Sequence, residues 1–202
     1  MTGVIVSVVV AVIVLFVMFL MYFYRDPCRK IPQDDVLVSP ADGRVIAIVD
    51  VDRKLDMKKG FGRVKVFTKD MGAGQFTAVS IFMNVLDVHV NRTPIDGEIG
   101  YVRHKKGKFV NAAKPKAFEN EKVEVMLFTK IGRVKVIQIA GLLARRIESF
   151  IKKGDKISRG MRIGRIKLGS QVTLIFPRNK VKVRVEVGDR LLAGSSVIGE
   201  IK

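Results

Sequence analysis

The chain has 202 residues and a formal net charge of +18, which is enough for one domain with its own core and an anchor, but not for two full domains. Its single cysteine, Cys28, excludes an intrachain disulfide, and the repeated Cys and His spacing of a structural metal site is absent. The strong positive charge is compatible with three surroundings: an anionic membrane surface, a nucleic acid, or solvent alone.

The first 24 residues carry no charged side chain, and Val4 to Tyr24 is an almost unbroken apolar run. About 20 such residues cross the hydrocarbon core of a bilayer as a helix. The basic residues come after the run, from Arg25 onward, whereas a signal peptide carries them before a shorter apolar core. We therefore expect a transmembrane anchor over residues 1–24, with a buried core helix and a signal peptide as the alternatives. The positive-inside rule places the rest of the chain on the cytoplasmic side.

The segment RDPCRKIPQDDVLVSP at residues 25–40 holds three prolines and alternating charges, a pattern typical of an extended segment. We expect a linker over residues 25–35 and one domain over residues 36–202. Within this domain, short β-branched runs such as GRVIAIVDV, FTAVSIFM and GRVKVIQIA are separated by Gly or Asp-Gly. Several alternate apolar and polar residues, which predicts a mainly β domain resembling a sandwich or barrel. Residues 141–160 fit either a helical face or turn-rich hairpins, and both interpretations stay open.

The basic residues are scattered among the predicted strands and form no single tract. No recognisable nucleic-acid-binding motif accompanies them. A basic domain held at a bilayer would be attracted to anionic lipid headgroups. We therefore expect a membrane partner and no nucleic acid, with a merely solvated basic surface as the alternative.

The chain offers two histidines, His89 and His104. His89 follows an apolar run and precedes a turn, where a strand delivers a side chain to the rim of a sheet, although a structural histidine would fit the same pattern. His104 lies among basic residues in YVRHKKGK and is expected in solvent. Asp42 lies in SPADGRV, an ordinary turn sequence.

Two Gly-Ser pairs are candidate nucleophile sites: Gly169-Ser170 in RIKLGSQVTLIFP and Gly194-Ser195 in LLAGSSVIGEIK. A glycine near the start of a strand marks a bulge, a bend or a close backbone approach. Either pair could be a simple turn or bulge, and spacing alone does not choose between them.

Seven segments occur in an order that resembles the phosphatidylserine decarboxylase family, particularly its short microbial and archaeal branch. They are YRDPCRKIP, SPADGRV, FMNVLDVHVNRTP, GKFVNAA, ENEK, QIAGLLARRI and RIGRIKLGSQVTLIFP. The resemblance implies that the serine of the LGS motif, here Leu168, Gly169 and Ser170, becomes a pyruvoyl cofactor after self-cleavage between Gly169 and Ser170. It also implies that Asp42, His89 and Ser170 act together in this maturation. The pair Gly194-Ser195 lies beyond the motif and is interpreted as a turn.

By this resemblance, His89 takes the proton of Ser170, and Asp42 holds the imidazole in the required tautomer. The products are fragments 1–169 and 170–202, which remain associated. The pyruvoyl group at position 170 forms a Schiff base with the amine of a serine phospholipid and promotes loss of carbon dioxide, without a metal. Many relatives carry a second histidine three residues after the first, where this chain has Arg92, so no role of that histidine is transferred.

The resemblance also suggests a homodimer and leaves the lipid open between a diacyl phosphatidylserine and an archaeal ether lipid. Two other functions use the same features. A membrane-anchored Ser-His-Asp hydrolase would keep a free Ser170, and a non-enzymatic basic β module would remain one intact chain.

Overall fold

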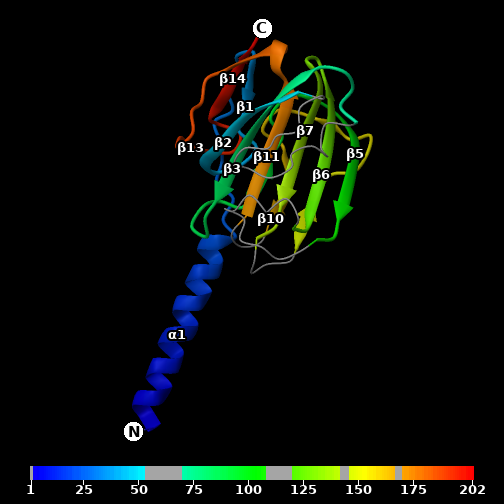
Figure 1. The fold of residues 1–202 in the computed structure, drawn as a ribbon. Coiled ribbons are helices and arrows are strands. Elements are labelled where there is room, and N and C mark those ends of the chain that lie inside the picture. Colours follow the sequence, from blue (N-terminus) through cyan, green and yellow to red (C-terminus); the bar gives the residue numbers. More distant parts are fainter. Residues whose placement is uncertain (1, 53–69, 108–119, 142–145, 167–169) are drawn as a thin grey trace.

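The computed structural model describes residues 2–52, 70–107, 120–141, 146–166 and 170–202 (Figure 1). The helix α1 (Thr2–Phe23) has no charged residue and is long and apolar enough to cross a membrane. Phe23 is the one buried residue in it, and Figure 1 shows the helix projecting away from the β-rich part of the chain. The predicted N-terminal apolar helix is confirmed.

After the helix, the described residues are predominantly strands, as predicted. The strands of the first half are β1 (Val36–Val38), β2 (Gly43–Asp52), β3 (Gln75–Met83), β4 (Val90–Arg92), β5 (Gly97–Lys105), β6 (Lys122–Thr129) and β7 (Gly132–Ile139). Those of the second half are β8 (Ile147–Ser149), β9 (Lys156–Ile157), β10 (Arg162–Ile166), β11 (Ser170–Pro177), β12 (Val181–Val183), β13 (Arg190–Leu191) and β14 (Val197–Ile201), with the 3-10 helix η3 (Arg178–Lys180) after β11.

The strands form three antiparallel sheets. The largest is a curled sheet of eight strands in the order β13-β2-β3-β11-β7-β6-β5-β9 (Figure 1). Two three-stranded sheets, β1-β14-β12 and β4-β10-β8, complete the domain. Because β11 lies between β3 and β7, the strand that begins at Ser170 is an interior strand of the largest sheet.

The strand β11 shows how the sequence pattern produces the core. Val172, Leu174 and Phe176 belong to the main hydrophobic core, whereas Ile175 belongs to a second apolar cluster. Successive side chains of a strand point to opposite faces, so the even-numbered residues face the main core. Both faces of β11 are covered, which explains why every residue from Ser170 to Phe176 is buried.

Residues 25–35, where a linker is predicted, form no helix or strand, and part of this segment packs on the domain. The side chain of Ile31 lies so close to Gly160 that a Cβ there would be 2.3 Å from Ile31 Cδ1. A Cβ at Gly194 would be 3.1 Å from the same atom. These two glycines have φ of +78° and +77°, values that glycine adopts without steric cost, so the segment is seated closely on two turns.

The open question over residues 141–160 is answered for its described part. Residues 147–149 form β8 and residues 156–157 form β9, so the described part holds strands and turns and no helix. The two strands do not form a hairpin with each other, because β8 pairs with β10 and β9 pairs with β5. Residues 147–149 pair with β10 as an edge strand, so they do not form the helix that the apolar spacing suggested. Residues 142–145 lie outside the described part of the chain.

Candidate active site

Ser170 is the first residue of β11 and is fully buried. It pairs with Met83, the last residue of β3, and its hydroxyl donates a hydrogen bond to Met83 Sδ at 3.4 Å. A thioether is a weak acceptor, so the hydroxyl is held only loosely. Gly169 and Leu168 lie outside the described residues.

The end of the core beside Ser170 is polar. Asn91, from β4, donates its amide to the same Met83 sulfur at 3.6 Å. Gln138, from β7, donates to Asn91 Oδ1 at 2.8 Å. All three side chains are fully buried, so three strands bring polar groups to one place inside the domain. Such a network restricts the side chains that it contains.

His89 lies just before β4 and is also buried. Its Nδ1 is 2.8 Å from the carbonyl oxygen of Asp87. A carbonyl can only accept a hydrogen bond, so Nδ1 carries the proton in the neutral ring and Nε2 carries the lone pair. Within the described residues, this buried Nε2 has no hydrogen-bond partner. The neutral ring can therefore act as a base through Nε2, which has no hydrogen-bond partner among the described residues.

The surroundings of His89 keep the ring neutral. Burial lowers the pKa of His89 below its usual 6.5, and the positive charge of Arg25 acts in the same direction. The hydrogen bond and the negative charge of Asp87 oppose this shift but do not cancel it. Phe23, at the end of α1, packs on the imidazole with the ring centroids 4.4 Å apart. The apolar helix thus contributes directly to the environment of the histidine.

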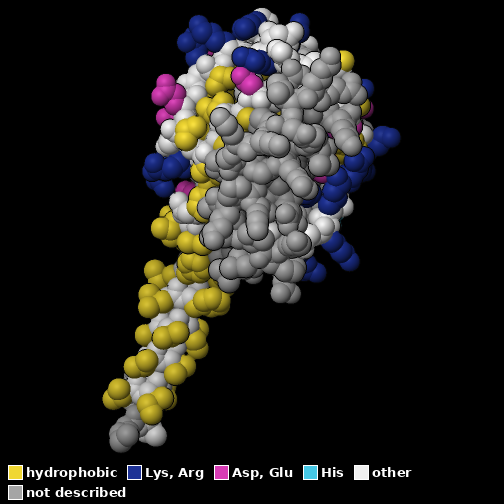
Figure 2. Space-filling view, in the orientation of Figure 1, with side chains coloured by type: hydrophobic (Ala, Val, Ile, Leu, Met, Phe, Trp, Pro, Cys, Tyr) yellow, Lys and Arg dark blue, Asp and Glu magenta, His cyan; other side chains and the backbone are white. Residues whose placement is uncertain are grey.

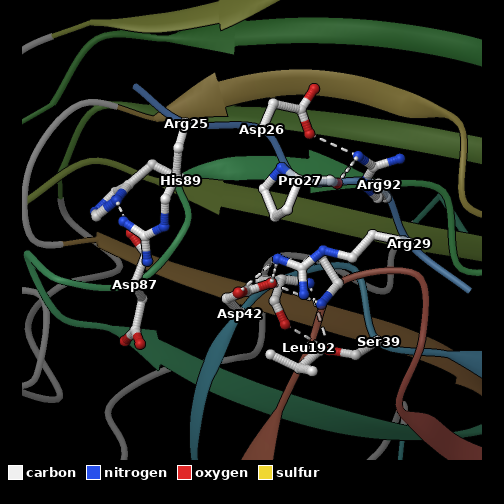
Figure 3. Close-up of polar contacts among 12 residues, drawn as sticks. Arg25, Asp26, Pro27, Arg29, Ser39, Asp42, Asp87, His89, Arg92 and Leu192 are labelled. Atoms are coloured by element: carbon white, nitrogen blue, oxygen red, sulfur yellow. Dashed lines mark hydrogen bonds and ion pairs between the residues drawn. The ribbon is translucent and has the colours of Figure 1, made fainter. Parts of the chain in front are cut away.

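Asp42 is buried in a separate polar group. Arg29 Nη2 donates to both carboxylate oxygens, at 3.0 and 2.8 Å, and the backbone N–H of Ala193 donates to Oδ1 at 2.8 Å. Figure 3 shows this group apart from His89, which lies with Arg25 and Asp87. The sequence-based hypothesis gave Asp42 the hydrogen bond to the imidazole, whereas in the structure the Asp87 carbonyl makes it. A role of Asp42 in catalysis stays a prediction.

Backbone pairing links His89 to the segment that precedes Ser170. The N–H of Ile166, the last residue of β10, donates to the His89 carbonyl oxygen at 3.2 Å. Only residues 167–169 separate Ile166 from Ser170. The strands β3 and β10 therefore bring the predicted base and the predicted nucleophile to the same end of the domain, which is the end that α1 adjoins (Figure 1).

Arg92 occupies the position of the second family histidine, and its side chain is held by hydrogen bonds within the domain. It is buried and donates to the Gly160 carbonyl oxygen at 2.9 Å and to Asp26 at 2.6 Å. It thereby joins the segment after α1 to β4.

His104 is half exposed, and its Nε2 is 2.8 Å from Glu121 Oε1, consistent with the expected solvent position.

The second Gly-Ser pair lies in a turn, as predicted. Gly194 has a φ of +77°, and the N–H of Ser195 donates to the Leu192 carbonyl oxygen at 3.1 Å. In the described part of the chain, no three His, Cys, Asp or Glu side chains gather in a way that could hold a metal ion.

Sequence reasoning missed several residues that shape the site. Arg29, Asp87, Asn91 and Gln138 were not singled out, although each lies in or beside a segment that carries the family resemblance. Their partners are far along the chain or on the backbone: Arg29 binds Asp42, 13 residues away, and Gln138 binds Asn91, 47 residues away. No local spacing in the sequence signals such pairs.

Comparison with known proteins shows the family to which the chain belongs. The family model for phosphatidylserine decarboxylase matches residues 16–199. The chain is 38% identical over 192 residues to a phosphatidylserine decarboxylase proenzyme of Carboxydothermus hydrogenoformans, covering 94% of this chain and 83% of that protein. It is 40% identical over 181 residues to a provisionally named archaetidylserine decarboxylase proenzyme of Methanothermobacter thermautotrophicus, covering 89% and 79% of the two chains.

A third relative, the phosphatidylserine decarboxylase proenzyme of Zymomonas mobilis, is 43% identical over 182 residues, which are 89% of this chain and 70% of that protein. The match spans the end of the helix, His89, the strand that begins at Ser170 and the first part of the last strand. The chain therefore belongs to the phosphatidylserine decarboxylase family.

Proposed function

We propose that the chain is a membrane-anchored proenzyme that cleaves itself between Gly169 and Ser170 and then decarboxylates a serine phospholipid to the ethanolamine phospholipid. The observation that carries this proposal is the free, buried Nε2 of His89 at the end of the domain where Ser170 begins β11. The names of the relatives, which are decarboxylase proenzymes, support the same reaction.

Self-cleavage uses groups of the chain alone. Ser170 Oγ attacks the carbonyl carbon of Gly169, while His89 Nε2 takes the hydroxyl proton and passes it to the departing amide nitrogen of residue 170. This exchanges the peptide bond for an ester. Removal of the Cα proton of residue 170 then expels the Gly169 carboxylate and leaves a dehydroalanine. One water molecule releases ammonia from it and leaves a ketone.

The surroundings of position 170 fit a pyruvoyl group. The side chain points into the core beside the uncharged Met83 thioether, with Asn91 as the next polar neighbour of that sulfur. Burial shields a reactive ketone from water. When formed, the pyruvoyl group supplies a carbonyl that takes the substrate amine and accepts the electron pair released with carbon dioxide. His89 is suited to return a proton to the substrate.

The sheet supports continued association of the two fragments. Fragment 170–202 would contribute β11 between β3 and β7, and its strands β13 and β14 pair with β2 and β1. Separating the fragments would expose an interior strand and its core side chains. The break in the chain therefore need not unfold the domain.

The apolar helix and the net charge of +18 support a position at a membrane. Figure 2 shows apolar side chains covering the helix and Lys and Arg spread over the domain. An anionic serine lipid would be attracted to such a domain more strongly than its zwitterionic product. We place the domain on the cytoplasmic side and leave the choice between a diacyl and an ether lipid to the assay.

Intact-mass analysis of the purified full-length protein tests the proposal. Wild-type protein is expected to give fragments 1–169 and 170–202, the second lighter than its serine form by one ammonia. Ser170→Ala should remain one chain and release no carbon dioxide from serine lipids, whereas the matched variant Ser195→Ala should be processed like wild type. A cleaved Ser170→Ala protein, or a fragment 170–202 that retains its amine, would show that the proposal is wrong. An uncut wild-type chain that hydrolyses added esters would favour the hydrolase.

A further inference from the structure

The connection between β3 and β4 presents two apolar side chains to the outside of the domain. Val85 is 39% exposed and Leu86 is 57% exposed. They precede Asp87, whose carbonyl holds His89. Single exposed apolar residues are common on protein surfaces. A function for this pair must therefore be argued from where the two residues lie and from how firmly their turn is held.

The turn that carries the two side chains is well ordered by its own hydrogen bonds. The N–H of Leu86 donates to Asn84 Oδ1 at 2.7 Å, and the N–H of Asn84 donates to Asp87 Oδ2 at 2.9 Å. The N–H of Asp87 donates to the Asn84 carbonyl oxygen at 3.1 Å. Side-chain bonds of this kind fix a tight turn, and they satisfy these three backbone donors without water.

The same turn is tied to the end of the apolar helix. Arg25 donates to the Leu86 carbonyl oxygen at 2.7 Å and to the Tyr22 carbonyl oxygen at 2.7 Å. Its guanidinium also lies over the Tyr22 ring, 3.7 Å from the centroid. Tyr and Arg at the end of a transmembrane helix are typical of the boundary between hydrocarbon and headgroups. Figure 1 shows the segment after the β3 arrowhead beside this end of α1.

We propose that Val85 and Leu86 insert into the bilayer beside the end of α1 and form a second membrane contact of the protein. The occupant is a phospholipid bilayer, because the two exposed apolar side chains lie on a turn that Arg25 joins to the end of the apolar helix through the Leu86 and Tyr22 carbonyl oxygens. The Leu86 carbonyl is bonded to Arg25, and N–H groups of the turn are bonded within it. These hydrogen bonds lower the free-energy cost of moving the turn from water into the bilayer. This inference rests on the proposed function only in taking α1 to be a membrane anchor.

A second contact has a consequence for the reaction. A single helix would leave the domain free to tilt, whereas two contacts fix which end faces the lipid. The end that is fixed carries His89 and Ser170. A headgroup would then reach the site while its acyl chains stay in the bilayer.

Site-directed spin labelling tests the contact directly. In a Cys28→Ser background, a nitroxide is attached to Leu86→Cys or to the control Phe128→Cys, and the full-length protein is reconstituted into vesicles of anionic phospholipid. Phe128 is 48% exposed and lies near the end of β6 opposite to Ser170. The Leu86 label should be relaxed by oxygen and protected from a water-soluble nickel complex, and the Phe128 label should show the reverse.

Equal nickel accessibility at the two labels would overturn the inference. A second copy of the chain covering the turn would overturn it as well, and would be recognised by spin–spin broadening at Leu86 that disappears on dilution with unlabelled protein. Neither readout depends on catalysis. Failure of the decarboxylase proposal would instead appear as unprocessed Ser170 in the same samples.

Activity gives an independent measurement. Leu86→Asp should self-cleave normally but lose about tenfold in turnover of serine lipid within vesicles, since a charge replaces an inserted side chain. Turnover of a short-chain serine phospholipid dispersed as monomers should not change, and Phe128→Asp should match wild type on both substrates. Equal losses of Leu86→Asp on both substrates would contradict a membrane role.

Discussion

The buried ion pair between Arg29 and Asp42 joins the segment after the helix to the turn before β2, and its removal should be costly. The two side chains are 8% and 7% exposed. Arg29→Met would leave the Asp42 carboxylate buried without its cationic partner, while the Ala193 N–H would still donate to Oδ1. Breaking one partner of a buried pair costs about 3–5 kcal/mol. For a chain of this size, that corresponds to a fall in Tm of roughly 6–20 °C.

Thermal unfolding followed by circular dichroism would measure this fall, since the chain has no tryptophan. The full-length protein in detergent should carry Ser170→Ala, so that every sample is one uncut chain. Adding Asp42→Asn to Arg29→Met removes both charges and should recover part of the loss. The matched control is Arg184→Met, which breaks the exposed pair with Glu200 and should change Tm little.

A Tm for Arg29→Met equal to that of Arg184→Met would refute the reasoning. It would mean that losing the cation of the buried pair costs no more stability than losing the cation of the exposed pair. The double variant with Ser170 restored then tests the role of Asp42. If Asp42 acts in maturation, the double variant should fold and remain uncut.

Two further predictions concern the base and the strand that leads to the cleavage site. Self-cleavage should persist below pH 6.5 and fall as the pH drops through the lowered pKa of His89, because only the neutral ring accepts a proton. Arg25→Gln removes a positive charge and should shift this fall to higher pH, whereas Arg25→Lys should not. The rate at which fragment 170–202 appears measures the profile, and an unshifted profile for Arg25→Gln would exclude the charge effect. Gly164→Ala should lower stability by about 1–3 kcal/mol and slow cleavage, because its Cβ would be 2.4 Å from the Glu148 carbonyl oxygen. An unchanged Tm and cleavage rate would contradict this and show that β8 can shift without a loss of stability.

The sequence alone was sufficient for the helix and for the class of the domain. An uncharged run of this length has few structures available to it other than an apolar helix. The alternation in GRVKVIQIA predicted a strand, and β7 occupies residues 132–139. These features depend on residues close together in the chain, which is why they could be predicted. Ordered motifs, from YRDPCRKIP to RIGRIKLGSQVTLIFP, were likewise sufficient for the family.

Tertiary structure decided which polar groups meet. Lys135 occupies a polar position in the alternating pattern of β7, yet it is fully buried because Asp70 pairs with its ammonium group from elsewhere in the chain. The imidazole of His89 is held by the Asp87 carbonyl, while Asp42 is bound by Arg29. Hydrogen bonds and ion pairs are set by distances of a few ångströms after the sheets have closed. Local spacing in the sequence carries no information about those distances.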